Sequence, residues 1–289
     1  MQTGYVERHE SPRLKYALLE PAIPARAPIL ITTGFAEHTA RYERLAERWR
    51  AAGFVVAVYD LRGQGESQGR PGHVERFHHY IDDAEATLTR LARHESWSSA
   101  GKPILFGHSL GGLISTHLAI REPGLVRGLG LSSPYFGRAL AVAPWKLWAG
   151  RLATRVWPTF AQPTGIHGGI LTHDLERARA IDADPLAKQI VTARWFTEVE
   201  RAQKYVLRNF RQLSVPVLCL AAGEDLVADI TRTQQVFATS SHSNQRLKIL
   251  EGEYHELHQE QGWERHADDF CRAFTQWTEQ PRPSATALP

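Results

Sequence analysis

Residues 103–112 read PILFGHSLGG, and residues 113–120 continue as LISTHLAI. The apolar run at the start predicts a buried strand, and the second segment has the pattern of a helix. Between them, Gly107-His108-Ser109-Leu110-Gly111 fits the Gly-x-Ser-x-Gly pattern of a sharp strand-to-helix turn, where larger side chains beside the serine would collide with the strand and helix. We predict that Ser109 occupies such a turn and is a candidate nucleophile.

The same pattern occurs a second time, because residues 65–69 read GESQG. Its surroundings differ from those of Ser109. The segment 62–64 in front of it is typical of a loop, and Pro71 and Gly72 behind it exclude a helix. Ser67 therefore lacks the strand and the helix that the turn requires, and Ser109 is the preferred candidate.

Short apolar runs alternate with helix-patterned segments along most of the chain, which predicts an α/β fold with a mostly parallel central sheet flanked by helices. The expected strands are Lys15–Leu18, Ile29–Thr33, Phe54–Tyr59, Ile104–Phe106, Leu129–Ser132, Val217–Ala221 and Leu247–Leu250. The expected helices are Arg41–Ala52, Ile81–Arg93, Leu110–Arg121, Asp229–Thr239 and Gln259–Thr278.

One interval breaks this alternation, since far more residues separate two consecutive strands than a crossover needs. We predict that residues 134–214 form an inserted helical cap, that residues 1–133 and 215–279 form the core, and that residues 280–289 form a flexible tail. Within the cap, Trp145 and Trp148 fall on one apolar helical face. That face either packs on the core or binds an acyl chain and a lipid surface.

A serine hydroxyl needs a base to accept its proton, and the base needs an acid to orient it. The acid is expected just after a late strand, where Val217–Ala221 is followed by Gly223, Glu224 and Asp225. We prefer Asp225, because Asp229 is suited to begin the next helix as a cap and the side chain of Glu224 should point elsewhere.

The base is expected after the last strand, and His255 follows Leu247–Leu250 through a short loop. His242, His258 and His266 are alternatives, and we expect the latter two to lie on the surface of the following helix. His255 is preferred because Ser109, Asp225 and His255 each follow the carboxyl end of a predicted strand, the edge at which such sheets place their sites.

Two backbone N–H groups are needed to stabilise the negative charge that develops on a carbonyl oxygen under attack. Leu110, directly after the serine, supplies one of them. The other is expected from the loop after Ile29–Thr33, through the N–H of Phe35, with Gly34 permitting a tight turn. A plain turn without this role is the alternative.

The composition limits the classes of protein to consider. Lys and Arg number 34 and Asp and Glu 31, and this net charge of +3 argues against a nucleic-acid binder. No apolar run approaches the roughly 18 residues that cross a bilayer, and residues 1–10 show no secretory signal, so a cytoplasmic location is expected. His73, His78 and His79 lack the ligand spacing of a zinc site, so no metal is predicted.

Further motifs extend the pattern around the serine. They are TGFAEH at residues 33–38 with Arg41-Tyr42, DLRGQGES at 60–67, GHV at 72–74, Asp184-Pro185 and Tyr254-His255-Glu256. With GHSLGG at 107–112, these residues resemble the α/β-hydrolase superfamily, and within it the group of monoacylglycerol lipases and bacterial lysophospholipases, which are serine aminopeptidase-like hydrolases. The resemblance runs from about Ile29 to Phe274, and Thr33 departs from the histidine that the family usually has there.

The resemblance implies that Ser109, Asp225 and His255 form the catalytic triad and that Phe35 and Leu110 supply the oxyanion amides. It implies hydrolysis of a small single-chain lipid ester through an acyl-enzyme on Ser109, with no metal or organic cofactor. Trp145 and Trp148 are candidate substrate contacts, and the cap is a candidate for peripheral contact with a membrane.

Several alternatives stay open. They are a carboxylesterase for short-chain or xenobiotic esters, an aminopeptidase-like amidase and a non-catalytic binding protein of the same fold. The sequence does not decide the oligomeric state or the physiological ester.

Overall fold

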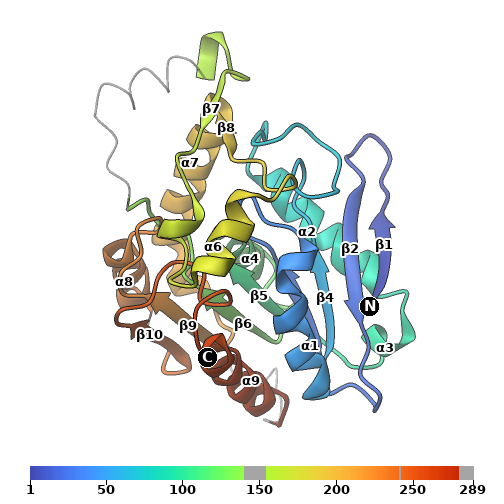
Figure 1. The fold of residues 1–289 in the computed structure, drawn as a ribbon. Coiled ribbons are helices and arrows are strands. Elements are labelled where there is room, and N and C mark those ends of the chain that lie inside the picture. The colour runs from blue at the N-terminus through green and yellow to red at the C-terminus, as the bar shows by residue number, and fades with distance from the viewer. Residues whose placement is uncertain (140–153, 241, 280–289) are drawn as a thin grey trace, which may run out of the picture.

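The computed structural model describes residues 1–139, 154–240 and 242–279. An eight-stranded sheet forms its centre, in the order β1-β2-β4-β3-β5-β6-β9-β10, with β1 and β10 at opposite edges (Figure 1). The strands are β1 (Gln2–Val6), β2 (Leu14–Leu19), β3 (Pro28–Thr32), β4 (Val55–Tyr59), β5 (Ile104–His108), β6 (Gly128–Ser132), β9 (Val217–Ala222) and β10 (Gln245–Leu250). The pairs β1–β2 and β2–β4 are antiparallel and the other five pairs of this sheet are parallel, so the predicted mostly parallel sheet is confirmed.

Apolar residues alternate between the two faces of the sheet because successive side chains of a strand point in opposite directions. In β4, Val56 and Val58 join one apolar cluster, with residues of α1 (Glu43–Ala51) and α9 (Trp263–Glu279). Val55 and Ala57 join the other cluster, with residues of α2 (His78–Leu91), α4 (Leu110–Arg121), α7 (Ala193–Asn209) and α8 (Ile230–Ala238). Helices therefore cover both faces of the sheet.

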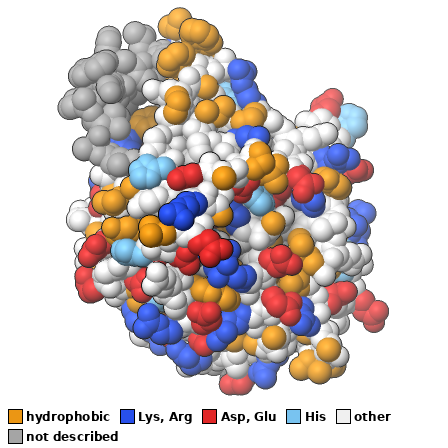
Figure 2. All heavy atoms as spheres, in the orientation of Figure 1, with side chains coloured by type: hydrophobic (Ala, Val, Ile, Leu, Met, Phe, Trp, Pro, Cys, Tyr) orange, Lys and Arg blue, Asp and Glu red, His pale blue; other side chains and the backbone are white. Residues whose placement is uncertain are grey.

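The remaining short elements connect these layers. They are η1 (Thr39–Tyr42), α3 (Glu95–Ser98), η2 (Gly168–Ile170), α6 (Leu175–Asp182), η3 (Phe210–Gln212) and the hairpin of β7 (Ala161–Pro163) and β8 (Ile190–Thr192). The space-filling view shows acidic and basic side chains interspersed over this face of the molecule (Figure 2).

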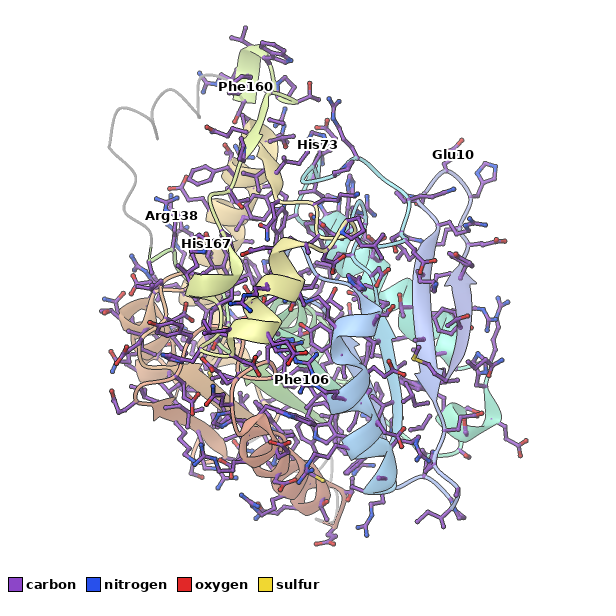
Figure 3. The ribbon with its side chains drawn as sticks, viewed as in Figure 1. Glu10, His73, Phe106, Arg138, Phe160 and His167 are labelled. Carbon is purple, nitrogen blue, oxygen red and sulfur yellow. The ribbon has the colours of Figure 1, made fainter. Side chains whose placement is uncertain are left out.

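The interval that the sequence predicts as a cap holds η2, α6, the β7–β8 hairpin, α7 and η3. Figure 3 shows Phe160 near the far end of the β7–β8 hairpin, well away from Phe106 in the core. Trp145 and Trp148, the predicted substrate contacts, lie outside the described residues, as do residues 280–289. We call residues 154–214 the cap segment.

Three features of the fold differ from what the sequence predicts. β1 has no counterpart among the expected strands, because QTGYV lacks an apolar alternation, and it forms by pairing with β2. The last helix begins at Trp263 and not at Gln259, because the residues before it form a buried loop. Within that loop lies His258, which is 5% exposed and is therefore not a surface residue of the helix.

Candidate active site

Ser109 lies at the turn between β5 and α4, with φ +52° and ψ −118°. A non-glycine residue with positive φ is strained, and such strain often marks functional turns. A Cβ at Gly107 would collide with the carbonyl of Gly111, and a Cβ at Gly111 would collide with the carbonyl of Thr32 in β3. The two glycines therefore let the strand, turn and helix approach closely enough to hold the serine in this conformation.

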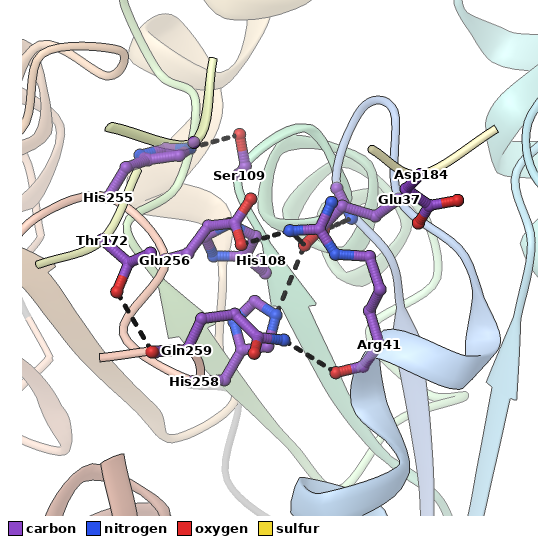
Figure 4. Close-up of polar contacts among 12 residues, drawn as sticks. Glu37, Arg41, His108, Ser109, Thr172, Asp184, His255, Glu256, His258 and Gln259 are labelled. Carbon is purple, nitrogen blue, oxygen red and sulfur yellow. Dashed lines mark hydrogen bonds and ion pairs between the residues drawn. The ribbon is translucent and has the colours of Figure 1, made fainter. Parts of the chain in front are cut away.

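Ser109, His255 and Asp225 form one hydrogen-bonded chain. His255 Nε2 lies 2.8 Å from Ser109 Oγ, and His255 Nδ1 lies 2.7 Å from Asp225 Oδ2. Figure 4 shows the contact between His255 and Ser109. The structure thus brings together the three residues that the sequence selected, from the carboxyl ends of β5, β9 and β10.

The acid of this chain is held in place by its own loop. Asp225 Oδ1 accepts hydrogen bonds from the backbone N–H groups of Val227 and Ala228, both at 2.8 Å, which leaves Oδ2 directed at the imidazole. Burial by itself would lower the pKa of His255, but the Asp225 carboxylate outweighs this effect and raises it. An imidazole with a raised pKa is a better proton acceptor.

The residues that the sequence offers as alternative acids and bases lie away from Ser109 or have another role. Asp229 is the N-cap of α8, where its side chain accepts from the N–H of Arg232, as expected. Glu224 is exposed. His242 precedes β10, so it lies at the amino end of that strand, whereas the triad lies at the carboxyl ends. His266 lies on α9 but is buried against Glu253, so the expectation of a surface group is wrong.

The two amides predicted to stabilise an oxyanion follow neighbouring strands at the same edge. Thr32 of β3 pairs with Gly107 of β5, so the loop that carries Phe35 starts beside the turn that carries Leu110. The positive φ in this loop belongs to Ala36, at +59°, so Gly34 does not serve the turn through a left-handed conformation. Gly34 is needed for space, because a Cβ there would collide with the Glu37 carboxylate.

A buried polar network lies next to the triad (Figure 4). Glu37 Oε2 accepts from the N–H of Gly34 at 2.6 Å and from the hydroxyl of Tyr42. Its Oε1 lies 3.3 Å from His258 Nε2 and 3.8 Å from a nitrogen of Arg41, which also pairs with Glu256. Sequence reasoning missed this network as a unit, although TGFAEH and Tyr254-His255-Glu256 contain part of it.

The ionisable side chains of this network are buried. Burial would raise the pKa of Glu37, but His108, His258 and Arg41 together hold it well below its usual range. Burial lowers the pKa of His108 well below its usual range. Glu37, His108 and His258 each present a possible metal ligand within 4.8 Å of one another. Arg41 already supplies a cation to Glu37, so we interpret the group as an ion-pair network.

The cap segment touches the site at several points. The N–H of Glu256, the residue after His255, donates to the carbonyl of Leu171 at 2.8 Å. Glu260 accepts from the N–H of Tyr254 at 3.0 Å and from the N–H of His173 at 3.1 Å. The loop that carries His255 is therefore fixed partly by the cap segment.

The parallel sheet, the strained serine turn and the hydrogen-bonded Ser109–His255–Asp225 chain define an α/β-hydrolase. The family model described as serine aminopeptidase, S33, matches residues 23–262. The chain belongs to this family, Hydrolase_4, as the sequence motifs predict.

The relatives of this chain include hydrolases of lipids. It is 29% identical to phospholipase YtpA of Bacillus subtilis, covering 81% of this chain and 89% of that protein. It is 28% identical to human monoglyceride lipase, covering 83% and 79%. The crystal structure of a monoacylglycerol lipase from Paleococcus ferrophilus has the same fold, with a TM-score of 0.78 at 24% identity, and the match covers 92% of this chain and 98% of that one.

No helix among the described residues is both long enough and apolar enough to cross a membrane.

Proposed function

We propose that this protein is a serine esterase that hydrolyses carboxylic esters of single-chain lipids, either monoacylglycerols or lysophospholipids. The observation that carries the proposal is the continuous hydrogen-bonded chain from Asp225 through His255 to Ser109 Oγ. The relatives named phospholipase and monoglyceride lipase support the choice of lipid esters over other acyl compounds.

In this proposal Ser109 Oγ attacks the ester carbonyl while His255 Nε2 accepts the hydroxyl proton. Asp225 stabilises the imidazolium that forms and keeps Nε2 directed at the serine. The imidazolium then gives its proton to the departing glycerol or glycerophospho oxygen, which leaves an acyl group on Ser109. A water that transfers its proton to His255 attacks the acyl-enzyme and releases the fatty acid.

The N–H groups of Leu110 and Phe35 are assigned to the oxyanion that forms during both steps. Leu110 begins α4, so its N–H is among those that a helix leaves unpaired at its first turn. Phe35 is held in place by its ring, which packs on Trp195 with the ring centroids 4.9 Å apart. Each donor of this kind contributes roughly 2.7–4 kcal/mol to transition-state stabilisation in hydrolases.

A substrate panel tests the proposal. Wild type and Ser109→Ala are assayed on monoacylglycerols, lysophospholipids, a diacylglycerol and short-chain aryl esters. We expect the highest turnover on single-chain lipids and a loss of several orders of magnitude in Ser109→Ala. Turnover limited to aryl esters would indicate a general carboxylesterase, and a Ser109→Ala enzyme that keeps most of its rate would overturn the proposal.

The family description as a serine aminopeptidase favours a second candidate, cleavage of an amide by the same three residues. Aminoacyl arylamides, added to the panel, distinguish the two reactions. Hydrolysis of arylamides faster than of lipid esters would replace the first candidate with the second.

We also propose contact of the cap segment with a lipid surface. Val156 and Trp157 are 78% and 61% exposed, and Trp157 packs against the half-exposed ring of Phe160. Apolar side chains gather at the top of the molecule in Figure 2. Arg155, which precedes Val156 in the sequence, is also exposed. Exposed aromatic residues next to a basic residue suit the interface of an anionic bilayer.

Sedimentation with anionic vesicles tests this contact. We expect wild type to sediment and Trp157→Ser to stay in solution. Leu175→Ser is the matched control, because Leu175 is 69% exposed but lies on α6. Equal sedimentation of Trp157→Ser and wild type would contradict the assignment of this surface.

A further inference from the structure

A cavity of about 420 Å³ lies beside the site, between α7, the start of α8 and the loop after β6. Its volume is within the range of small-molecule sites, roughly 300–1,000 Å³. The catalytic chain does not line it, but two of its walls are shared with the site. The N–H of Tyr135 donates to the carbonyl of Ser109 at 2.9 Å, and Trp195 packs against Phe35.

One part of the cavity wall is apolar and aromatic. Trp195, Phe196, Val199 and Leu207 come from one stripe of α7, and Phe136 comes from the loop after β6. The indole N–H of Trp195 donates to the hydroxyl of Tyr80 at 3.1 Å, which fixes the ring as part of the wall. This part of the wall is suited to a hydrocarbon chain.

The other part of the wall is basic. It contains Arg138, Lys204, Arg208 and Arg232 against two carboxylates, those of Glu200 and Asp229. Figure 3 shows Arg138 on the side of the molecule where the loop after β6 emerges.

Both carboxylates of the cavity already have partners. Glu200 pairs with Lys204 at 3.1 Å, and Asp229 accepts from the backbone N–H of Arg232 as the N-cap of α8. The guanidinium of Arg232 donates to the amide oxygen of Gln235 at 2.8 Å. Within residues 1–139, 154–240 and 242–279, no carboxylate forms an ion pair with Arg208 or Arg232. The cavity therefore has an excess of positive charge that an anion would neutralise.

We propose that this cavity binds single-chain amphiphiles with an anionic head group. The apolar stripe of α7 takes the hydrocarbon chain, and Arg208 and Arg232 pair with the carboxylate or phosphate. The site is separate from the catalytic residues, and binding there requires no ester bond and no turnover. A free fatty acid and a lysophosphatidic acid share the chemistry that the cavity recognises.

Fluorescence quenching tests the proposal directly. A brominated fatty acid quenches an indole only when the bromine is near it, so binding is followed through Trp195 in the Ser109→Ala protein, in which hydrolysis is removed. We expect saturable quenching that is lost in Ser109→Ala/Trp195→Phe. Saturable quenching that persists unchanged without Trp195 would place the ligand elsewhere and overturn the proposal.

The charge requirement is tested with two matched sets of variants. Arg208→Gln and Arg232→Gln, each in the Ser109→Ala background, should weaken binding of the fatty acid by about tenfold. Arg246→Gln removes the same charge from an exposed position on β10 and should leave the affinity for the fatty acid unchanged. Thermal melts establish that all variants are folded. Equal affinities in the cavity and control variants would overturn the charge assignment.

The choice of ligand is tested by displacement of the brominated probe. Lysophosphatidic acid and oleate should both displace it, and the tighter of the two identifies the preferred head group. A monoacylglycerol of the same chain length should displace it at least about tenfold less well. Equal displacement by the neutral lipid would show that the basic wall does not select an anionic head group, and the proposal would fail. This outcome does not depend on whether the protein hydrolyses esters.

Discussion

His38 Nε2 lies 2.7 Å from Asp184 Oδ2. His38 belongs to the loop after β3, which also carries Phe35, and Asp184 follows α6 in the cap segment. The two side chains are 11% and 16% exposed, so water screens their interaction only partly. One contact therefore connects the cap segment to the loop that is proposed to stabilise the oxyanion.

Replacing Asp184 by alanine should weaken this connection. Burial raises the pKa of Asp184, but the hydrogen bonds from His38 and from the N–H of Leu186, together with the charges of His38 and Arg41, outweigh it, and the net shift is downward. A carboxyl with a lowered pKa stabilises the fold above its unfolded pKa, and that stabilisation is lost as the pH falls. At pH 7 we expect Asp184→Ala to lower the free energy of unfolding by about 1–3 kcal/mol, measured by urea denaturation.

The matched control for this variant is Glu251→Ala, which removes an exposed carboxylate after β10. Its free energy of unfolding should stay within about 0.5 kcal/mol of wild type. If the difference between Asp184→Ala and wild type is the same at pH 7 and at pH 3, the His38 contact does not depend on the charge of Asp184.

Ser67 provides a second prediction, because it stands in the rejected copy of the Gly-x-Ser-x-Gly pattern. Its hydroxyl donates to the carbonyl of Asp60 at 2.7 Å and accepts from the N–H of Lys15 at 2.9 Å. Ser67→Ala should therefore keep its kcat and lose about 1–3 kcal/mol of stability, since a part-buried N–H loses its partner. Esterase assays and denaturation of Ser67→Ala beside Ser109→Ala check this. A loss of kcat in Ser67→Ala comparable to that in Ser109→Ala would contradict the choice between the two motifs.

The positions of Ser109, Asp225 and His255 could be predicted because all three follow parallel strands. The carboxyl ends of such strands meet at one edge, so a local pattern was enough to bring distant residues together. The identity of the acid also followed from local chemistry, since Asp229 is suited to a helix N-cap and takes that place.

The surroundings of the triad could not be predicted in the same way. Glu37, His108 and His258 come from three loops or strands, and no periodicity relates their positions. His258 also follows the helical pattern of the next segment. It lies in a loop because its ring stacks on Tyr42, with the ring centroids 4.5 Å apart, beside Glu37. Tertiary packing therefore determines where α9 begins.

Glu37 itself provides a third prediction. Glu37→Ala would leave the N–H of Gly34 and the hydroxyl of Tyr42 without their acceptor, and it would leave Arg41 with one fewer carboxylate neighbour. Removing one member of a buried ionic network costs about 3–5 kcal/mol. Denaturation should show this loss at pH 7, and Glu37→Gln, which keeps an acceptor oxygen, should lose less. Equal losses in the two variants would show that the acceptor oxygen is not what the network requires.

The pH dependence of catalysis follows from the environment of His255. Only the neutral imidazole accepts the proton of Ser109, so kcat/KM should fall as the pH decreases through the pKa of His255. Burial lowers that pKa and the Asp225 carboxylate raises it by more, so the midpoint should lie above the ordinary histidine value of about 6.5.

Asp225→Asn tests the cause, because it removes the charge and leaves the burial. The midpoint should then move below about 6.5, and kcat should fall by about 10⁴-fold, as expected for a histidine that has lost its orienting acid. Rates on an activated aryl ester between pH 5 and 9 measure both effects. Since burial of His255 is nearly complete, at 3% exposed, a midpoint that does not move in the variant would mean that another group, such as the nearby Glu256, sets the pKa.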